Sequence, residues 1–359
     1  MSPSGRADWG KNSLFMQAFR LIRNRTNSQL SIRPTARQTT NMKTIQLTET
    51  DGTDALTYES VPRPKPDNDE LLVRVHAAGV NPLDWLICRG ILPELRDEPL
   101  PWIPGWELSG VVESVGADVT EFEPEDAVCG MVRLPGAGGT FAEFTTMTVD
   151  EVTAKPPSLS HTEAAGLPMA GQTAFHALYQ ASELDTGQRV LVHAAAGGVG
   201  HMAVQFATNT GAHVIGTASG RNEQFLRRLG IDEFVNYREG RFEDVIDDVD
   251  IVLDSIGGEV LERSVEVAQS GGVIVTLPDQ PAADTIERFQ AEHDVKVWFF
   301  DVLTESDPAT LQSVTDRVER GVLKPTISGS YPLSKAQEAL DKSAEGHVRG
   351  KLVLDLTAE

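Results

Sequence analysis

The spacing of hydrophobic residues divides the 359-residue chain into two unlike parts. In the first part, short apolar runs are separated by turns rich in glycine and proline. The expected strands are residues 42–45, 71–77, 109–116, 126–132 and 141–147. Many short strands with this punctuation are typical of a barrel-like β-module.

Beyond this part, the pattern favours strands that alternate with helices. Ser160 is a candidate N-cap for a helix over residues 161–167, because Glu163 follows three positions later. The further strands are expected at residues 190–193, 213–217, 249–254, 272–277 and 351–356, and the helices at residues 199–209, 222–229 and 259–269. This alternation predicts right-handed βαβ units and a parallel sheet.

A turn of small residues follows the strand at 190–193 and opens the next helix. It consists of Ala194, Ala195, Ala196, Gly197, Gly198, Val199 and Gly200. Small residues let the backbone approach a pyrophosphate closely, and the helix N-terminus offers free N–H groups to its charge. We interpret residues 196–200 as a dinucleotide-binding turn. A tight turn without a ligand is the alternative, since the strict G-x-G-x-x-G form is absent.

In such folds, residues at the end of the next strand, here residues 213–217, roughly 20 residues after the turn, decide between NAD and NADP. A carboxylate there would hold the ribose hydroxyls of NAD, but this chain has Thr217, followed by Ser219 and Arg221. Ser219 and Arg221 can hold a 2′-phosphate, so NADP(H) is the expected cofactor. The alternative for Arg221 is a solvated arginine at the start of a helix.

The net charge of the chain limits the partners it can bind and indicates the kind of cell it comes from. The chain has 31 basic and 53 acidic residues, a formal net charge of −22, and only 9 of the basic residues are lysines. Residues 1–41 contain seven basic side chains and one acid, a charge of +6, so the remaining chain carries −28. This acidity argues against nucleic acids and anionic membranes as partners. It favours a salt-adapted source, because salt screens the self-repulsion of such a surface.

The basic segment of residues 1–41 has three interpretations. It resembles a transit peptide in being rich in Arg and Ser, it could be a flexible basic arm, or it is not translated. We favour the last, because Met42 begins a plausible first strand. With only Cys88 and Cys129, a disulfide framework is excluded, and a cytoplasmic location is expected.

Several stretches together resemble the medium-chain dehydrogenase/reductase superfamily, in particular its zinc-free quinone oxidoreductase-like branch. They are residues 79–85, 104–112, 139–144, 167–174, the glycine turn and residues 350–354. The resemblance implies an α/β fold in which a doubly wound parallel Rossmann sheet is inserted into a GroES-like β-barrel-type domain. The expected boundaries are residues 42–165 and 301–359 for the GroES-like catalytic domain, and residues 166–300 for the Rossmann domain.

Zinc-dependent relatives in this superfamily bind catalytic zinc through side chains at three places in these stretches. Here those places hold Asn81, Trp106 and Met169, none of which is a usual zinc ligand. Glu107 remains, but one carboxylate makes no zinc site. We therefore expect a metal-free enzyme.

The resemblance also implies roles for individual residues. Asn81 would lie beside the nicotinamide ribose and the substrate oxygen, and Thr173 near the nicotinamide. Tyr237 and Ser219 would help to bind the adenosine phosphate, and Lys351, like Arg349, would approach the cofactor. The alternatives are a turn residue for Asn81, helix packing for Thr173, a strand-end aromatic for Tyr237 and a salt bridge for Lys351.

Without a metal, the expected reaction is hydride transfer from NADPH to a quinone or an α,β-unsaturated carbonyl, with Asn81 and Thr173 as catalytic residues. Trp85, Trp106 and Phe300 are candidates for a flat apolar substrate pocket, with core packing as their alternative. Two other functions stay open: reduction of an enoyl thioester, and nucleotide binding with a sensor or structural role. The resemblance further implies a homodimer.

Overall fold

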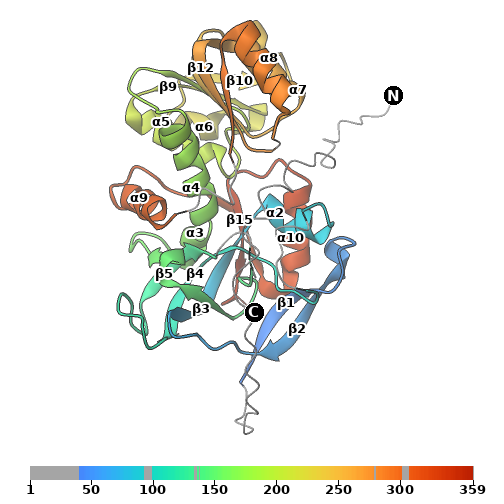
Figure 1. Ribbon diagram of the computed structural model, residues 1–359, viewed down its shortest axis with the longest axis vertical. Coiled ribbons are helices and arrows are strands. Elements are labelled where there is room, and N and C mark those ends of the chain that lie inside the picture. Colours follow the sequence, from blue (N-terminus) through green and yellow to red (C-terminus); the bar gives the residue numbers. More distant parts are fainter. Residues whose placement is uncertain are drawn as a thin grey trace.

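The computed structural model describes residues 40–92, 99–132, 136, 138–278, 280–300 and 307–358. The predictions for residues 1–39 therefore lie outside the described residues. The chain forms a Rossmann domain and a β-barrel-type domain, which lie at opposite ends of the molecule in Figure 1. Among the described residues, none of the helices combines the length and the apolar character that a membrane span needs.

The barrel-type domain is built around a sheet with the strand order β14-β15-β3-β4-β5-β7, and β6 also pairs with β3. Its strands are β3 (Glu70–Val80), β4 (Glu107–Val115), β5 (Ala127–Met131), β6 (Phe144–Thr148), β7 (Val152–Ala154), β14 (Ile327–Pro332) and β15 (Lys351–Asp355). A hairpin of β1 (Asn41–Leu47) and β2 (Leu56–Pro62) lies beside it. The four strands predicted between residues 71 and 147 and the first strand are confirmed, with ends shifted by a few residues.

The end of the chain completes this sheet. Strand β15 pairs antiparallel with β3, so that Leu352 lies opposite Val80. This register brings Lys351, at the start of β15, next to Asn81, which follows β3. Two segments about 270 residues apart in sequence therefore meet at one place.

The Rossmann domain contains a parallel sheet with the order β10-β9-β8-β11-β12-β13, which is the doubly wound order. Its strands are β8 (Arg189–Val192), β9 (His213–Ala218), β10 (Glu233–Asn236), β11 (Val249–Asp254), β12 (Ala268–Thr276) and β13 (Lys296–Phe299). The helices that accompany them are α5 (Gly200–Thr210), α6 (Glu223–Leu229), α7 (Glu259–Val267) and α8 (Ala283–His293). The predicted parallel α/β sheet is confirmed.

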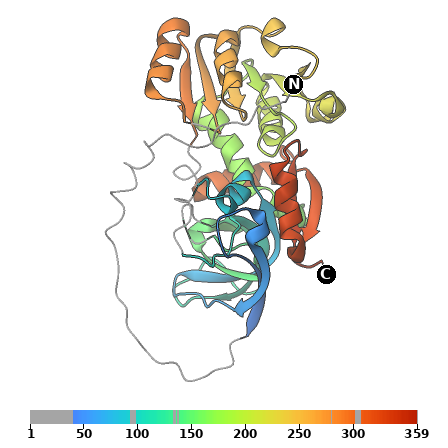
Figure 2. The same ribbon diagram turned by 90° about the vertical axis from the view of Figure 1, so that its right-hand side faces the viewer.

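Short helices cover the barrel and join the two domains (Figures 1 and 2). They are α2 (Pro82–Cys88), α3 (His161–Ala165), α4 (Pro168–Phe175), α9 (Pro308–Glu319) and α10 (Ala336–Ala344). The predicted cap of α3 is confirmed, because the Ser160 side chain accepts a hydrogen bond from the backbone of Glu163 and the reciprocal bond is present.

The return of the chain from the Rossmann domain to the barrel is bonded to the dinucleotide helix α5. Three polar side chains of α5, four residues apart, face residues 322–326; they are His201, Gln205 and Asn209. Their bonds reach the backbone N–H of Thr326 at 3.0 Å, the N–H and carbonyl of Lys324 at 2.9 and 3.1 Å, and the carbonyl of Val322 at 3.3 Å. We call these contacts the α5 ladder.

Candidate active site

A cavity of about 1310 Å³ lies between the two domains and is lined by residues of both. Pockets for drug-sized molecules are roughly 300–1,000 Å³, so this space suits a ligand as large as a dinucleotide together with a small substrate. Most of the predicted site residues line it: Asn81, Thr173, Ala196, Gly197, Gly198, Val199, Gly200, Thr217, Ser219, Tyr237, Phe300 and Lys351. Arg221, Trp85 and Trp106 are not on the described part of its wall.

The described wall of this cavity contains basic but no acidic residues, in contrast to the acidic chain as a whole. None of its described lining residues is an Asp or a Glu, although the chain has 53 acidic residues. Its charged lining residues among those described are Arg263 and Lys351. An anionic ligand therefore meets no carboxylate on the described wall, and both the helix N-terminus and Arg263 favour it.

The glycine turn packs so closely that a larger residue would collide with backbone. A Cβ atom added to Gly200 would lie 2.4 Å from the carbonyl oxygen of Ala194 and 2.8 Å from the Cα of Ala195. At Gly197 the corresponding distance to the same oxygen is 3.1 Å. The turn thus offers its backbone to the cavity at the start of α5, which fits the pyrophosphate of a dinucleotide.

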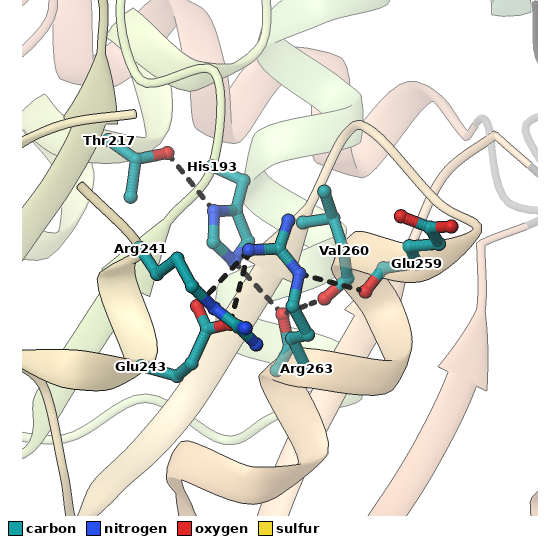
Figure 3. A network of polar contacts seen from close by, with 8 residues as sticks. His193, Thr217, Arg241, Glu243, Glu259, Val260 and Arg263 are labelled. Carbon is teal, nitrogen blue, oxygen red and sulfur yellow. Dashed lines mark hydrogen bonds and ion pairs between the residues drawn. The ribbon is translucent and has the colours of Figure 1, made fainter. Parts of the chain in front are cut away.

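His193, which directly follows β8, lines the cavity and is hydrogen-bonded to Thr217 of strand β9 (Figure 3). Because Ser264 Oγ donates to the carbonyl of Val260, it accepts from His193 Nε2 at 2.9 Å, and His193 Nδ1 then accepts from Thr217 Oγ1 at 3.0 Å. Burial lowers the pKa of His193 to about 3, and the nearby charge of Arg263 acts in the same direction. The ring is therefore neutral, and the hydroxyl hydrogen of Thr217 is used inside the protein.

Arg263 enters the cavity from α7 and is held in place before any ligand arrives. Its Nη1 lies 3.1 Å from Oε2 of Glu243, and its guanidinium lies 5.0 Å from the centre of the Phe242 ring. Arg241 binds the same carboxylate at 2.5 Å, so two arginines share one Glu243 (Figure 3). This leaves a net positive charge beside the cavity.

Arg221 is not on the described cavity wall, and its side chain reaches across to the other domain. Its Nη2 donates to the carbonyl oxygen of His347 at 2.7 Å, while Arg349 donates to Asn222 Oδ1 at 2.9 Å. Asn222 Nδ2 in turn donates to Ser219 Oγ at 3.3 Å, which leaves the Ser219 hydroxyl hydrogen for a ligand. The structure brings Ser219 and Tyr237 to the cavity, and it uses Arg221 in a bridge between the domains.

The two tryptophans predicted for the substrate pocket lie elsewhere. Trp106 is fully buried in the barrel core, where its ring centre is 5.7 Å from that of Trp102. Trp85 packs at the edge of the same core, with the Arg89 guanidinium over its ring. Other apolar residues line the cavity instead, among them Leu83, Leu86, Ile91, Leu92, Phe299 and Phe300.

A buried ion pair lies at the barrel end of the cavity. Lys351 Nζ is 2.8 Å from Oε1 of Glu107, and the side chains are 3% and 0% exposed. The same Oε1 accepts a hydrogen bond from Asn81 Nδ2 at 2.7 Å, and Oε2 accepts from the backbone N–H of Met169 at 2.8 Å. Lys351 therefore takes part in a salt bridge, the alternative role, and also lines the cavity where a cofactor would bind.

Asp84 is the second buried carboxyl group of this region. Its Oδ2 accepts from the backbone N–H of Asn81 at 2.7 Å, as part of the capping box that starts α2. Burial raises the pKa of Asp84 to about 7, although the Asn81 hydrogen bond and the charge of Lys351 act against this. Burial also raises the pKa of the Cys88 thiol to about 12, which makes it unreactive.

Asp84 and Arg263 are not among the site residues predicted from the sequence, where Glu107 enters only as a carboxylate too isolated to bind zinc. A charged residue between apolar neighbours at the start of a strand was the available signal for Glu107. The side chain of Thr173 donates to the carbonyl of Met169 at 2.8 Å, so it can only accept a hydrogen bond from a ligand. Among the described residues, there is no group of three or more His, Cys, Asp or Glu side chains that could hold a metal ion.

Comparisons with known proteins agree with this fold. Residues 67–157 match the model of the alcohol dehydrogenase GroES-like domain, and residues 229–354 match that of a zinc-binding dehydrogenase. The chain belongs to the medium-chain dehydrogenase/reductase superfamily, within its quinone-oxidoreductase-like members. It is thus an oxidoreductase with a nicotinamide cofactor.

Particular relatives are similar over most of the chain. The quinone-oxidoreductase homolog of Spinacia oleracea chloroplasts is 32% identical over 313 residues, which are 85% of this chain and 95% of that protein. The NADPH-dependent alkenal/one oxidoreductase of Arabidopsis thaliana chloroplasts is 31% identical, over 87% of this chain and 79% of that protein. The quinone oxidoreductase structure from Coxiella burnetii has a TM-score of 0.82 at 35% identity and covers 88% of this chain and 100% of its own.

Proposed function

We propose that this protein reduces a quinone or an α,β-unsaturated carbonyl with NADPH and without a metal ion. The observation that carries the proposal is the described cavity wall, which has no carboxylate in a strongly acidic chain. When bound there, the nicotinamide supplies a hydride, and the protein contributes binding, orientation and hydrogen bonds. The similarity to relatives named as quinone and alkenal/one oxidoreductases supports the choice of acceptor.

NADPH is proposed over NADH because of the residues at the end of β9. Thr217 and Ser219 occupy the positions where a carboxylate would select NAD. Ser219, Asn222 and Tyr237 all line the cavity, and the backbone N–H of Tyr237 donates to the carbonyl of Ala218, next to Ser219. Arg221 and Arg349 lie behind this turn and add positive charge for a 2′-phosphate.

The absence of a metal from the reaction is proposed from the chemistry of the donor atoms. Met169 and Asn81 line the cavity, and Trp106 is buried in the barrel core. Zinc prefers thiolate, imidazole and carboxylate ligands, and the carboxylate present, Glu107, is already neutralised by Lys351. Quinones and enones need little activation, since a hydrogen bond to the oxygen that gains charge is sufficient.

Within this reaction, Asn81 is the proposed catalytic residue. One of its Nδ2 hydrogens is bonded to Glu107, and the second is available for an acceptor oxygen. Lys351 Nζ donates to three acceptors inside the protein, which are Val80 O, Asn81 Oδ1 and Glu107 Oε1. Since Lys351 has no proton to spare, the final proton comes from water.

The test is NADPH consumption with 1,4-benzoquinone and with a 2-alkenal, at low and high salt. We expect turnover of at least one of the two acceptors, a lower rate with NADH and full activity after treatment with a chelator. Tight NADPH binding without turnover of either acceptor would contradict the proposed reaction. Loss of activity on chelation would contradict the metal-free proposal alone.

A further inference from the structure

The side chain of Asn81 can occupy its site in two orientations of nearly equal shape. They differ by a half-turn that exchanges the carbonyl oxygen, which accepts hydrogen bonds, with the NH₂ group, which donates them. Only the neighbouring groups decide which orientation is stable. At Asn81 these neighbours are an ammonium group, which can only donate, and a carboxylate, which accepts when ionised.

The two neighbours are themselves held firmly. The three N–H bonds of Lys351 have three acceptors, including the backbone carbonyl of Val80 at 3.1 Å. Glu107 receives hydrogen bonds on both oxygens, from Asn81 and Lys351 on Oε1 and from the Met169 backbone on Oε2. Neither charged group can turn without leaving a buried donor or acceptor unpaired.

In the observed orientation, Oδ1 of Asn81 faces the Lys351 ammonium and Nδ2 faces Glu107. The reversed orientation would place the NH₂ group against an ammonium and the oxygen against a carboxylate. Both contacts would be repulsive, and the three residues are largely buried, so water does little to relieve the repulsion. The amide therefore has one orientation, with one N–H directed to Glu107 and the second left for a ligand.

We propose that Glu107 and Lys351 are positioning residues, which act on the reaction by fixing the amide of Asn81 so that its second N–H donates to the acceptor oxygen. This inference rests on the proposed function and extends it to two residues that do not contact the acceptor. It also accounts for a buried ion pair beside an apolar part of the cavity, where such a pair is costly unless it is fully hydrogen-bonded.

The proposal predicts an effect that depends on the acceptor. An enone needs a hydrogen bond to its carbonyl oxygen more than a strongly oxidising quinone does, since the quinone accepts a hydride without such help. Loss of the fixed orientation should thus slow reduction of a 2-alkenal more than that of 1,4-benzoquinone. A purely structural role of the ion pair would slow both equally.

The first variant is Glu107→Gln. The glutamine cannot accept on both sides, because its NH₂ group must face either Met169 N–H or the Asn81 and Lys351 side chains. We expect kcat/KM with the 2-alkenal to fall about 100-fold, as for loss of one oxyanion donor, and with 1,4-benzoquinone less than 10-fold. The KM for NADPH should change by less than about threefold, since Glu107 is not on the described cavity wall.

The matched control is Glu113→Gln. Glu113 lies on the same strand β4 and pairs with Arg63 at 2.7 Å, away from the cavity. It should leave both acceptor activities near the wild-type values. Because a single buried charge left unpaired is a risk for folding, the double variant Glu107→Gln/Lys351→Met removes both charges together and should show the same difference between the acceptors.

A readout without turnover separates this inference from the proposed function. In protein labelled with ¹⁵N-asparagine, the Asn81 side-chain amide is identified by its absence in Asn81→Asp. Its hydrogen exchange should be slow in the wild type and at least tenfold faster in the double variant. If the wild type reduces neither acceptor, the proposed function fails while this readout still tests the fixed amide. Equal exchange rates, or equal losses with both acceptors, would overturn the inference.

Discussion

The backbone N–H of Asn81 donates to Oδ2 of Asp84 at 2.7 Å, while Oδ1 of Asp84 makes no well-formed hydrogen bond within the described residues and has only the backbone of Gly105 nearby. The carboxyl group thus starts the helix α2 and is at the same time half-satisfied in a buried place. Because this buried carboxyl group titrates, it makes the stability of the folded protein depend on pH.

We expect Asp84→Asn to stabilise the protein at pH 8. The pKa of Asp84 is raised from 3.8 to about 7, so the folded state binds the proton more tightly than the unfolded state. Its contribution to stability is therefore lost as pH rises from about 4 to 7, on the order of 4 kcal/mol in full. Urea unfolding of both proteins at pH 5 and pH 8 checks this, and a smaller difference at pH 8 than at pH 5 would contradict it.

In the Asp84→Asn variant, where Asp84 no longer titrates, we expect the free energy of unfolding to rise with pH over the mildly acidic range. Burial lowers the pKa of His193 to about 3 and that of His201 to about 4, below the ordinary value of 6.5. The unfolded state then binds more protons, so stability falls as pH drops from 6.5 towards 4, by a few kcal/mol in order of magnitude. Unfolding midpoints measured in steps between pH 7 and pH 4.5 should decrease steadily, and a flat profile would contradict neutral buried histidines.

Arg263→Gln should weaken NADPH binding about 10- to 100-fold, which is the loss of one charge-assisted contact. Arg241→Gln is the matched control, because Arg241 binds the same Glu243 but its side chain is 63% exposed and does not line the described cavity. It should change the affinity less than threefold. Fluorescence titration with NADPH measures both, and equal effects of the two substitutions would show that Arg263 acts only through Glu243.

The effect of replacing a glycine in the turn by alanine, on NADPH binding and on folding, should depend strongly on which glycine is replaced. Gly200→Ala places a methyl group 2.4 Å from a backbone oxygen that cannot move aside, so we expect loss of NADPH binding or of folding. Gly197→Ala, with a nearest distance of 3.1 Å, should bind NADPH within about tenfold of the wild type. Thermal unfolding with and without NADPH distinguishes the two, and equal behaviour would contradict the close packing at Gly200.

The strands, helices and parallel sheet could be predicted from the sequence because their signals are local, whereas the insertion of one domain into the other followed from the family resemblance. Short strands, the Ser160 cap and the alternation of strands and helices each depend on a few neighbouring residues, and the structure has them within a few positions. The contact of Lys351 with Glu107 depends instead on the register of β15 against β3, which no local pattern gives. The sequence could thus name Lys351 but not its partner.

The prediction that Trp106 lines the substrate pocket was wrong for a different reason. Trp106 and Glu107 are neighbours in an extended segment, so their side chains point in opposite directions. Glu107 faces Asn81, and Trp106 therefore faces the barrel core. For Arg221, the domain arrangement decides, since its partner His347 is 126 residues away.

The α5 ladder has a mechanical consequence. The helix that begins at the glycine turn is bonded along its length to residues 322–326, which continue into strand β14 of the barrel. The dinucleotide helix and the entry to the barrel therefore move as one body. A rotation that opened the cavity would need its pivot at this seam, and it would have to break the second bridge between the domains, the hydrogen bond from Arg221 to the carbonyl of His347.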